Sequence, residues 1–207
     1  MRVTAETKAE TRHRILDAAR QLFVARGYEA TTTRDIAEAA SIANGTLFNY
    51  FANKEAVLAS LVAEVAAGIH SDFEIRSTEE GSFEEELFAF VAAGLRKLKP
   101  WRKQLPVLLE TALNPLTMAP ADDAQAMRLS HLDMVARLAR HHGLGDLPAM
   151  ALQLYWTLYV GVLMFWAQDN SPKQEDTLGL LDSSLAMLTG WLKPEKDSLS
   201  ENKKGGA

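Results

Sequence analysis

Cysteine is absent from this sequence of 207 residues. Its absence excludes disulfide bonds, thiolate metal sites and cysteine nucleophiles, and it is compatible with a reducing cytosol. We expect no signal peptide, since charged residues run through the first twenty positions. The longest apolar run, residues 158–167, is about half of the ~20 residues that a membrane span requires. We therefore expect a cytoplasmic protein with no membrane partner.

Motifs for catalysis are lacking as well. None of the five histidines forms an HExxH pair, and no Glu-x-x-His repeat indicates a di-iron bundle. The sequence has no glycine-rich phosphate loop and no nucleophile elbow. His141 and His142 adjoin the end of a predicted helix, where a cation is favoured, so we expect them to cap that end. The sequence predicts no enzyme, no catalytic residue, no cofactor and no metal site.

Positive charge is in deficit, with a net charge of −5 that is not typical of a nucleic-acid-binding protein. The charge is unevenly spread, however. Residues 1–55 carry eight Lys and Arg against seven Asp and Glu, whereas the remainder carries 14 against 20. A local basic surface can bind phosphates while the rest of a molecule stays acidic. The charge balance therefore allows a nucleic-acid partner at the N-terminal end.

A pattern of two short helices joined by a tight turn is present in residues 31–51, TTTRDIAEAASIANGTLFNYF. We expect Thr32 to cap the first helix, with Asp35 three residues later completing a capping box. Residues 41–43 turn the chain, and Ile42 can fill the space between the two helices. This arrangement predicts a DNA-binding helix-turn-helix.

The second of these helices begins at about residue 44 and has two different faces. Leu47 and Phe51 are four residues apart, so they share one apolar face. Gly45, Phe48 and Asn49 lie on the opposite face. A short helix with one apolar stripe and a polar and aromatic outward face suits insertion into a major groove of DNA.

A longer run of the sequence resembles the tetracycline-repressor (TetR) family of bacterial transcription regulators. It begins with TRHRILDAARQLFVARGYEATTTRDIA and ends with GTLFNYFANKEAVL, so it covers about residues 11–58. The resemblance is specific because four features are in register: Gly27-Tyr28, the threonine cap, Gly45-Thr46-Leu47 and Asn53-Lys54-Glu55. The remaining three quarters of the chain matches the family only in architecture.

The resemblance implies particular contacts with double-stranded DNA. By position, contacts with the DNA backbone are implied for Thr32, Thr33 and Lys54. Contacts in the groove are implied for Asn44, Gly45, Thr46, Phe48, Asn49 and Tyr50. The chemistry fits, since hydroxyls, amides and helix N-termini bind phosphate oxygens and Asn can pair with an adenine edge.

Three positions depart from the common pattern of the family. Ala43 stands where a Ser cap is frequent, so the second helix is expected to start weakly or to shift its cap to Asn44. Asn44 itself replaces a frequent Lys, which removes one phosphate or base contact. Phe48 replaces a frequent Tyr and can touch a thymine methyl instead. We expect these changes to alter specificity. The alternative for Phe48 and Tyr50 is that both are core aromatics.

The rest of the sequence reads as helix throughout, and the expected fold class is all-α. Residues 1–54 are expected to form a three-helix DNA-binding domain with the helix-turn-helix. Residues 55–193 are expected to form a helical bundle that binds an effector and dimerises. Residues 194–207 are expected to be a disordered tail.

The last two predicted helices are apolar enough to pack on two sides. Residues 152–167 are apolar all round, and the final helix has leucines in alternating steps of three and four. This pattern suggests an intersubunit four-helix bundle, as members of the family form. The alternative is that both helices are only the core of their own domain. The expected homodimer interface consists of Leu154, Leu158, Gly161, Phe165, Leu178, Leu181, Leu185, Leu188 and Leu192.

The resemblance also implies a small effector, and the scarcity of charge on the helix faces favours an apolar one. The candidates for its pocket are Phe88, Val91, Leu95, Trp101, Leu105, Met127, His131, Trp156, Tyr159 and Leu163. Such residues are more often plain core, which is the alternative for each. We expect a DNA-binding transcriptional regulator, a repressor released from a palindromic operator by its effector. The alternative function is a helical DNA-binding protein of the same fold without an effector, architectural or regulated by another protein.

Overall fold

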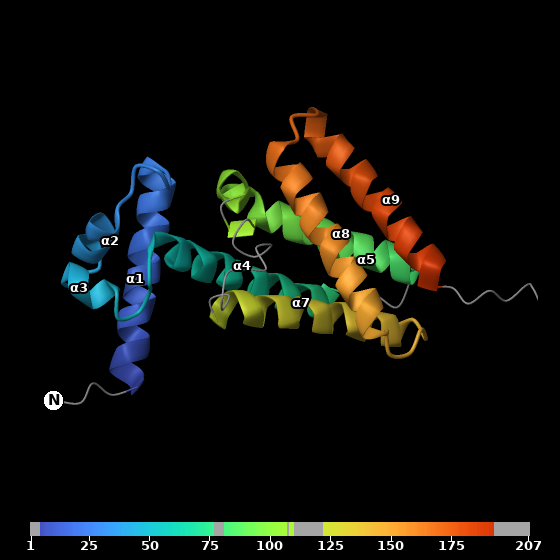
Figure 1. Ribbon diagram of the computed structural model, residues 1–207, viewed down its shortest axis with the longest axis horizontal. Coiled ribbons are helices and arrows are strands. Elements are labelled where there is room, and N and C mark those ends of the chain that lie inside the picture. Colours follow the sequence, from blue (N-terminus) through green and yellow to red (C-terminus); the bar gives the residue numbers. More distant parts are fainter. Residues whose placement is uncertain (1–4, 77–80, 107, 110–121, 193–207) are drawn as a thin grey trace, which may run out of the picture. The chain divides into compact units, whose positions relative to one another are not determined.

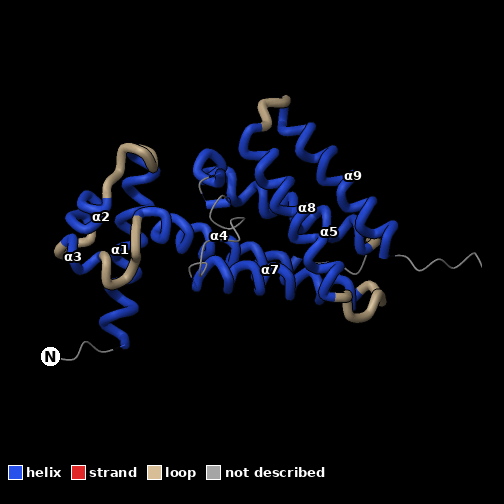
Figure 2. Tube along the Cα trace, viewed as in Figure 1, coloured by secondary structure: helices blue, strands red, loops and turns tan. Residues whose placement is uncertain are grey.

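The structure is a computed structural model that describes residues 5–76, 81–106, 108–109 and 122–192. Within these residues every element is a helix (Figures 1 and 2), which confirms the predicted all-α fold. The α-helices are α1 (Ala5–Arg26), α2 (Thr33–Ala39), α3 (Asn44–Leu47), α4 (Lys54–Arg76), α5 (Phe83–Leu98), α7 (Asp122–His141), α8 (Ala149–Gln168) and α9 (Glu175–Leu192). Two 3₁₀ helices, η1 (Lys99–Gln104) and η2 (Pro172–Gln174), connect some of them. The predicted tail of residues 194–207 lies outside the described residues.

The chain divides into two compact units. The first unit comprises Met1–Ser77 and Ala93–Met134, and the second comprises Thr78–Ala92 and Val135–Ala207. Helices α5 and α7 each contribute to both. The first unit continues past residue 54 because α4 packs against α1. The two units therefore do not separate at the predicted domain boundary between residues 54 and 55. That this boundary divides DNA binding from effector binding and dimerisation stays a prediction.

The core of the first unit holds the three N-terminal helices together. Ile15, Ala19 and Phe23 recur at helical spacing on α1 and are buried where α1 meets α2 and α4. Leu47 of α3 and Leu58 of α4 are wholly buried. Burying one leucine stabilises a fold by about 1.5–3 kcal/mol. That packing is what maintains α3, since a helix of four residues is not stable alone.

Two arginines of α1 also join it to α4. Arg12 donates to the Ser60 hydroxyl at 3.0 Å, and its guanidinium lies 5.2 Å from the centre of the Phe51 ring. Arg20 donates to Glu64 at 2.7 Å. Helices α1 and α4 are therefore linked by polar contacts along the same side on which they share a core.

The second unit is built around α8 and α9, which are neighbours joined by a short turn. Its core includes Tyr155 and Trp166 of α8. The Asp169 carboxylate closes the turn by accepting from the backbone N–H groups of Ser171 at 2.7 Å and Thr177 at 3.0 Å, and from the Thr177 hydroxyl. These bonds, the one from the Thr177 hydroxyl above all, hold the pKa of Asp169 well below its usual range.

His142, which was predicted with His141 to cap the end of α7, pairs with a carboxylate of α5. Its Nε2 lies 2.8 Å from Glu86 Oε2, and both side chains are largely buried. The pair ties the chain after α7 to the first turns of α5. The fold brings this imidazole to α5, which a sequence position cannot show.

Among the residues that the structure describes, two helices are long and apolar enough to cross a membrane by length and composition alone, namely residues 54–73 of α4 and the whole of α8. Core helices of proteins that never enter a membrane satisfy the same criterion. Leu58 and Leu61 of α4 and Tyr155 and Trp166 of α8 are buried within the protein. The two helices are therefore weak evidence for a membrane.

Candidate DNA-binding surface

Helix α2 begins with a capping box. The Thr32 hydroxyl accepts from the Asp35 N–H at 3.2 Å, and the Thr32 N–H donates to Asp35 Oδ2 at 2.8 Å. The predicted cap is therefore confirmed. The hydrogen bonds from Thr32, its hydroxyl first, lower the pKa of Asp35. Thr32 is exposed and Thr33 partly exposed at the positive end of the helix, where hydroxyls and N–H groups can reach a phosphate.

The turn between α2 and α3 contains a serine in the left-handed backbone conformation. Ser41 has φ +55°. Its N–H donates to the Glu38 carbonyl at 3.0 Å, and the N–H of Ile42 donates to the Ala37 carbonyl at 2.9 Å. This pair of bonds is a Schellman motif, in which the left-handed position is usually glycine. The half-buried Ile42 then follows at the turn, as the sequence predicted.

Helix α3 starts without a side-chain cap. Ala43 is its N-cap residue and makes no capping hydrogen bond, while Asn44 is already the first helical residue. Of the two outcomes expected from Ala43, the structure shows the weak start and not a shift of the cap to Asn44. The helix itself covers only four residues. Backbone bonds from Asn49 to Thr46 and from Phe51 to Leu47 continue the coil beyond it.

The two faces of α3 are separated as the sequence predicted. Leu47 and Phe51 are buried at 0% and 4% exposure, whereas Phe48 is 48% exposed. Phe48 is therefore not a core aromatic. The remaining predicted groove residues are exposed or partly exposed, namely Asn44, Gly45, Thr46, Asn49 and Tyr50. Together they form an outward surface that we call the α3 face.

Gly45 on the α3 face is not required by the protein's own packing. A Cβ atom built on Gly45 would meet no atom within 4 Å. Its φ is not in the left-handed region, so the backbone conformation does not require glycine either. A helical glycine costs about 0.5–1 kcal/mol relative to alanine. The presence of glycine at position 45 is explained if another molecule approaches the backbone closely there.

The ammonium of Lys54, a predicted phosphate contact, is hydrogen-bonded inside the first unit, and its contact with DNA stays a prediction. Its Nζ donates to the carbonyl of Tyr28 at 2.9 Å and to that of Thr31 at 3.0 Å. Nζ also lies 4.0 Å from the centre of the Tyr28 ring. The sequence analysis noted Gly27-Tyr28 and Lys54-Glu55 as parts of one pattern but did not connect them. The spacing of 26 residues between Lys54 and Tyr28 carries no signal of contact without the fold.

Comparison with known proteins agrees with this geometry. Residues 15–61 match the family model described as bacterial regulatory proteins, tetR family. The chain belongs to the TetR family. It is 32% identical over 124 residues to the uncharacterized HTH-type transcriptional regulator YvkB of Bacillus subtilis, covering 56% of this chain and 64% of that protein. It is 31% identical over 134 residues to the HTH-type transcriptional repressor KstR of Mycobacterium tuberculosis, covering 65% of this chain and 57% of that protein. The chain thus spans less than two thirds of either relative.

Among solved structures, the chain is similar to the TetR family transcriptional repressor FadR of Thermus thermophilus, determined in complex with lauroyl-CoA. The TM-score is 0.68 at 26% identity, and the match covers 86% of this chain and 93% of FadR. The likeness therefore extends well beyond the helix-turn-helix that the family model covers. It includes the C-terminal helices, for which the sequence offered only a helical pattern.

The predicted effector residues of this TetR-family chain fall into two groups of five. Leu95, Trp101, Leu105 and His131 are buried in the first unit, and Met127 is partly buried there. Val91 and Leu163 are buried in the second unit, and Phe88, Trp156 and Tyr159 are partly buried there. Their role in binding an effector stays a prediction.

Two of these candidates have informative surroundings. Trp101 packs edge-on against Phe23 of α1, with ring centres 6.4 Å apart, so it takes part in the core that supports the helix-turn-helix. The His131 imidazole lies 5.7 Å from that of His70. Burial first, and His70 second, lower the pKa of His131 to about 3, so its ring is neutral at pH 7.

The predicted dimer residues divide between two sides of the α8–α9 pair. On α9, Leu181, Leu185 and Leu188 are each 2% exposed, so they pack within the chain's own core rather than facing a partner. This corrects the prediction for these three leucines. The leucines whose spacing predicted α9 lie on the side of the helix that faces α8. Leu192, the last of them, is partly buried.

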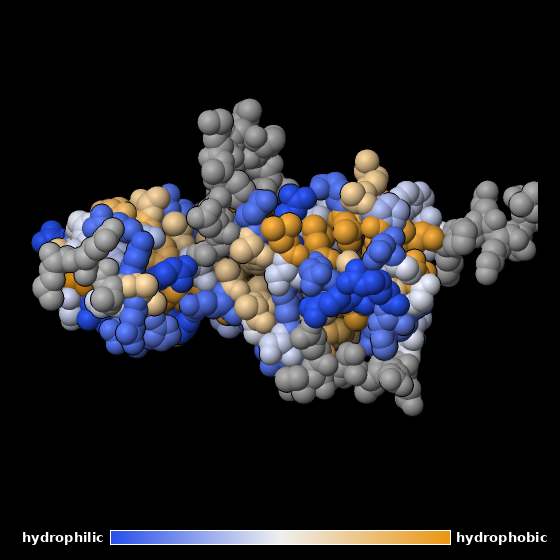
Figure 3. All heavy atoms as spheres, turned by 90° about the horizontal axis from the view of Figure 1, so that it is seen from below, coloured by the Kyte–Doolittle hydropathy of each residue, from blue (hydrophilic) through white to orange (hydrophobic). Residues whose placement is uncertain are grey.

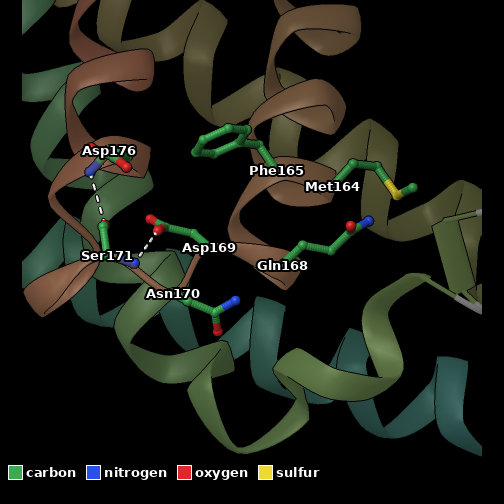
Figure 4. A pocket seen from close by; sticks show the side chains of 7 residues that line it. All are labelled: Met164, Phe165, Gln168, Asp169, Asn170, Ser171 and Asp176. Carbon is green, nitrogen blue, oxygen red and sulfur yellow. Dashed lines mark hydrogen bonds between the residues drawn. The ribbon is translucent and has the colours of Figure 1, made fainter.

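On α8, the predicted residues do face outward. Leu154 and Phe165 are 39% and 44% exposed, Gly161 is exposed and Leu158 partly so. A hollow of about 630 Å³ at the α8–α9 turn is lined by Phe165 of α8 and by Asp176 of α9, so these two residues lie on the same side of the pair (Figure 4).

The position of Asp176 identifies which flank of α9 continues this surface. Leu180, Met187 and Trp191 follow it at steps of four, seven and four residues, so they lie on the same flank. They are 38%, 72% and 56% exposed. Leu178 is exposed on the other flank. We call the resulting surface the α8–α9 face. Figure 3 shows that hydrophobic residues lie at the surface on one side of the molecule.

Proposed function

We propose that this protein is a ligand-responsive transcriptional repressor that binds a palindromic operator in double-stranded DNA as a homodimer. The observation that carries the proposal is the α3 face. It is an exposed strip of amide, hydroxyl, glycine and aromatic groups, held outward by two buried side chains, Leu47 and Phe51. Asn can read an adenine edge, and an apolar ring can contact a thymine methyl. The capped start of α2 supplies groups that suit the DNA backbone.

The α8–α9 face supports a homodimer. Five of its members are large apolar side chains that the chain itself leaves between about a third and three quarters exposed, namely Leu154, Phe165, Leu180, Met187 and Trp191. Contiguous exposed apolar surface of this kind marks protein–protein interfaces. In a twofold dimer the same surface is used by both subunits. The proposed interface therefore keeps Leu154, Leu158, Gly161 and Phe165 of the predicted set. It omits the five predicted leucines of α9, three of which are buried, and adds Leu180, Met187 and Trp191.

We propose a small, mainly apolar effector. Support comes from the apolar character of the candidate residues and from FadR of Thermus thermophilus, whose structure holds lauroyl-CoA. The mechanism has two states, one of which spaces the two α3 helices one helical turn of DNA apart, about 34–36 Å. The effector binds the other state more tightly. A hundredfold loss of operator affinity requires a difference of about 2.7 kcal/mol between the two states.

The protein is further proposed to be cytoplasmic and to have no enzymatic activity. Both follow from its family, since a regulator acts where DNA is and needs no catalytic group. Among the residues that the structure describes, no group of three or more His, Asp and Glu residues could hold a metal ion. The proposed mechanism uses dimerisation and effector binding alone.

The test is a fluorescence-anisotropy titration with the DNA upstream of this protein's own gene, against a scrambled duplex of equal length, at two salt concentrations. Tight binding of the upstream duplex near physiological salt, with release of the scrambled one, would support the proposal. Lauroyl-CoA and free coenzyme A are then added to the complex. Release by the first alone supports an apolar acyl effector. Equal, salt-sensitive binding of both duplexes would instead favour an architectural protein of the same fold.

A further inference from the structure

We propose that the α3 face reads A·T base pairs, through the thymine methyl group and the adenine edge, and that it reads no G·C pair. Phe48 and Asn49 are the specificity-determining residues, Phe48 for a thymine and Asn49 for an adenine. The inference rests on the proposed function, since it specifies what each half of the operator contains where α3 enters the major groove. Bases that other elements of the protein reach are not part of it.

The first observation is that the α3 face carries no charged side chain. Residues 43–53 contain no Lys, Arg, His, Asp or Glu. The usual reader of guanine is an Arg or Lys that donates to O6 and N7, and the usual reader of cytosine is an Asp or Glu that accepts from the N4 amino group. Both partners for a G·C pair are therefore missing from this part of the chain. The exposed Arg34 belongs to α2, so a guanine read by Arg34 would not be read by the α3 face.

The second observation is the outward position of the Phe48 ring. Leu47 and Phe51 are buried at 0% and 4% exposure, whereas Phe48 is 48% exposed. The ring has no polar atom, so packing it on a phosphate or a polar base edge would remove water from that group without replacing its hydrogen bond. The apolar group that the major groove offers is the C5-methyl of thymine. Burial against this methyl is therefore the favourable contact for an exposed phenylalanine in the groove.

The third observation is that side-chain amides accompany the Phe48 ring on the α3 face. Asn49 follows Phe48 directly and is exposed, and so is Asn44, which does not cap α3. An amide offers an acceptor and a donor side by side. Adenine presents the complementary pair, the N7 acceptor and the N6 amino donor, whereas guanine presents two acceptors, N7 and O6. Against guanine the amide oxygen would face O6 without a hydrogen bond, so the amide prefers adenine.

These three observations agree on one kind of base pair. Thymine and adenine are the two halves of an A·T pair, and Phe48 and Asn49 are consecutive residues. The bases that they reach therefore lie in the same base pair or in neighbouring ones. Burial of one methyl group contributes a factor of about four to affinity. A twofold dimer makes the contact in both half-sites, which gives a factor of about fifteen for the whole operator.

The experiment uses the full-length protein and a pool of duplexes with a randomised central region. The bound fraction is sequenced for the intact protein, Phe48→Ala, Asn49→Ala and Val24→Ala. Phe48 and Asn49 are exposed, so their replacement leaves the core of the first unit intact. Val24 of α1 is 75% exposed, so its variant is the control for loss of an exposed apolar side chain outside the α3 face. Positions whose base preference is lost only in Phe48→Ala or only in Asn49→Ala are the bases that each residue reads.

A second measurement removes the methyl group from the DNA instead of the ring from the protein. In the selected operator, deoxyuridine replaces the thymine assigned to Phe48 in both half-sites, which deletes the C5-methyl and keeps the base pair. Anisotropy gives the affinities of the intact protein and of Phe48→Ala for both duplexes. The four affinities form a double-mutant cycle, in which any effect of deoxyuridine on the DNA alone cancels.

We expect thymine at the positions assigned to Phe48 and adenine at those assigned to Asn49, with Val24→Ala selecting the same sequences as the intact protein. Deoxyuridine should lower the affinity of the intact protein about fifteenfold and leave that of Phe48→Ala nearly unchanged. A G·C pair at the assigned positions, or equal affinity of the intact protein for both duplexes, would overturn the proposal while leaving the proposed function in place. If the intact protein selects no sequence at all, the proposed function itself fails.

Discussion

Gly45 offers a test in which stability and DNA binding should change in opposite directions. It is exposed on the α3 face and is the second residue of a helix whose backbone does not require glycine. A Cβ at this position meets no atom within 4 Å. Gly45→Ala therefore removes the entropic cost of glycine without a clash. We expect the free energy of unfolding to rise by about 0.5–1 kcal/mol.

DNA binding of Gly45→Ala should weaken, because the open space beside Gly45 is the space that the DNA would occupy. If α3 lies in a major groove, the backbone at Gly45 is close to the DNA, and a methyl group there forces the helix outward. Displacement lengthens every hydrogen bond from the α3 face at once. We expect operator affinity to fall at least tenfold, which corresponds to about 1.4 kcal/mol.

The two quantities are measured by urea denaturation followed by circular dichroism and by anisotropy with the operator duplex. Gly179→Ala is the matched control, since Gly179 is an exposed residue of α9 whose added Cβ also meets nothing within 4 Å. It should gain similar stability and bind DNA normally. Unchanged binding by Gly45→Ala would refute the placement of α3 in the groove. A loss of stability would refute the claim that the space beside Gly45 is open.

Three further predictions follow from other parts of the molecule. Ser41→Gly should raise the free energy of unfolding by about 1 kcal/mol, because glycine adopts the left-handed conformation without the cost that a side chain brings, and urea denaturation measures this. His131 has a pKa of about 3 in the fold against 6.5 when unperturbed, so stability should fall as the pH drops below about 6.5, by up to about 1.4 kcal/mol per pH unit. His131→Leu should flatten that part of the pH profile, and a profile identical to that of the intact protein would contradict the burial of a neutral ring. Trp191→Ala should shift the monomer–dimer equilibrium toward monomer in sedimentation velocity, whereas Leu178→Ala, on the other flank of α9, should not.

Local features were predicted where the signal lies within a few residues. The capping box of Thr32 and Asp35 was read from a spacing of three residues, and the buried face of α3 from the spacing of four between Leu47 and Phe51. The weak start of α3 followed from the absence of a capping side chain on Ala43. In each case the determining interaction is a backbone or side-chain contact inside one turn, so the sequence alone contains it.

Predictions about faces of the C-terminal helices were less secure. The leucine ridge of α9 was correctly read as apolar, but an apolar ridge can face either its own domain or a second subunit. The structure turns Leu181, Leu185 and Leu188 toward α8 and leaves Leu180, Met187 and Trp191 outside. Helical periodicity specifies which residues share a face. It does not specify what that face meets.

The sequence by itself therefore determined the all-helical fold class, the start of α2 and the two faces of α3, and its resemblance to the TetR family identified the family. The start of α2 and the faces of α3 depend on hydrogen bonds and periodicity within single turns. Only the tertiary structure decided that the Lys54 ammonium binds the carbonyls of Tyr28 and Thr31, and which flank of α9 is exposed. Both depend on how elements far apart in the chain are brought together, because the acceptors that a lysine reaches and the exposure of a helix flank are set by the neighbours that the fold supplies.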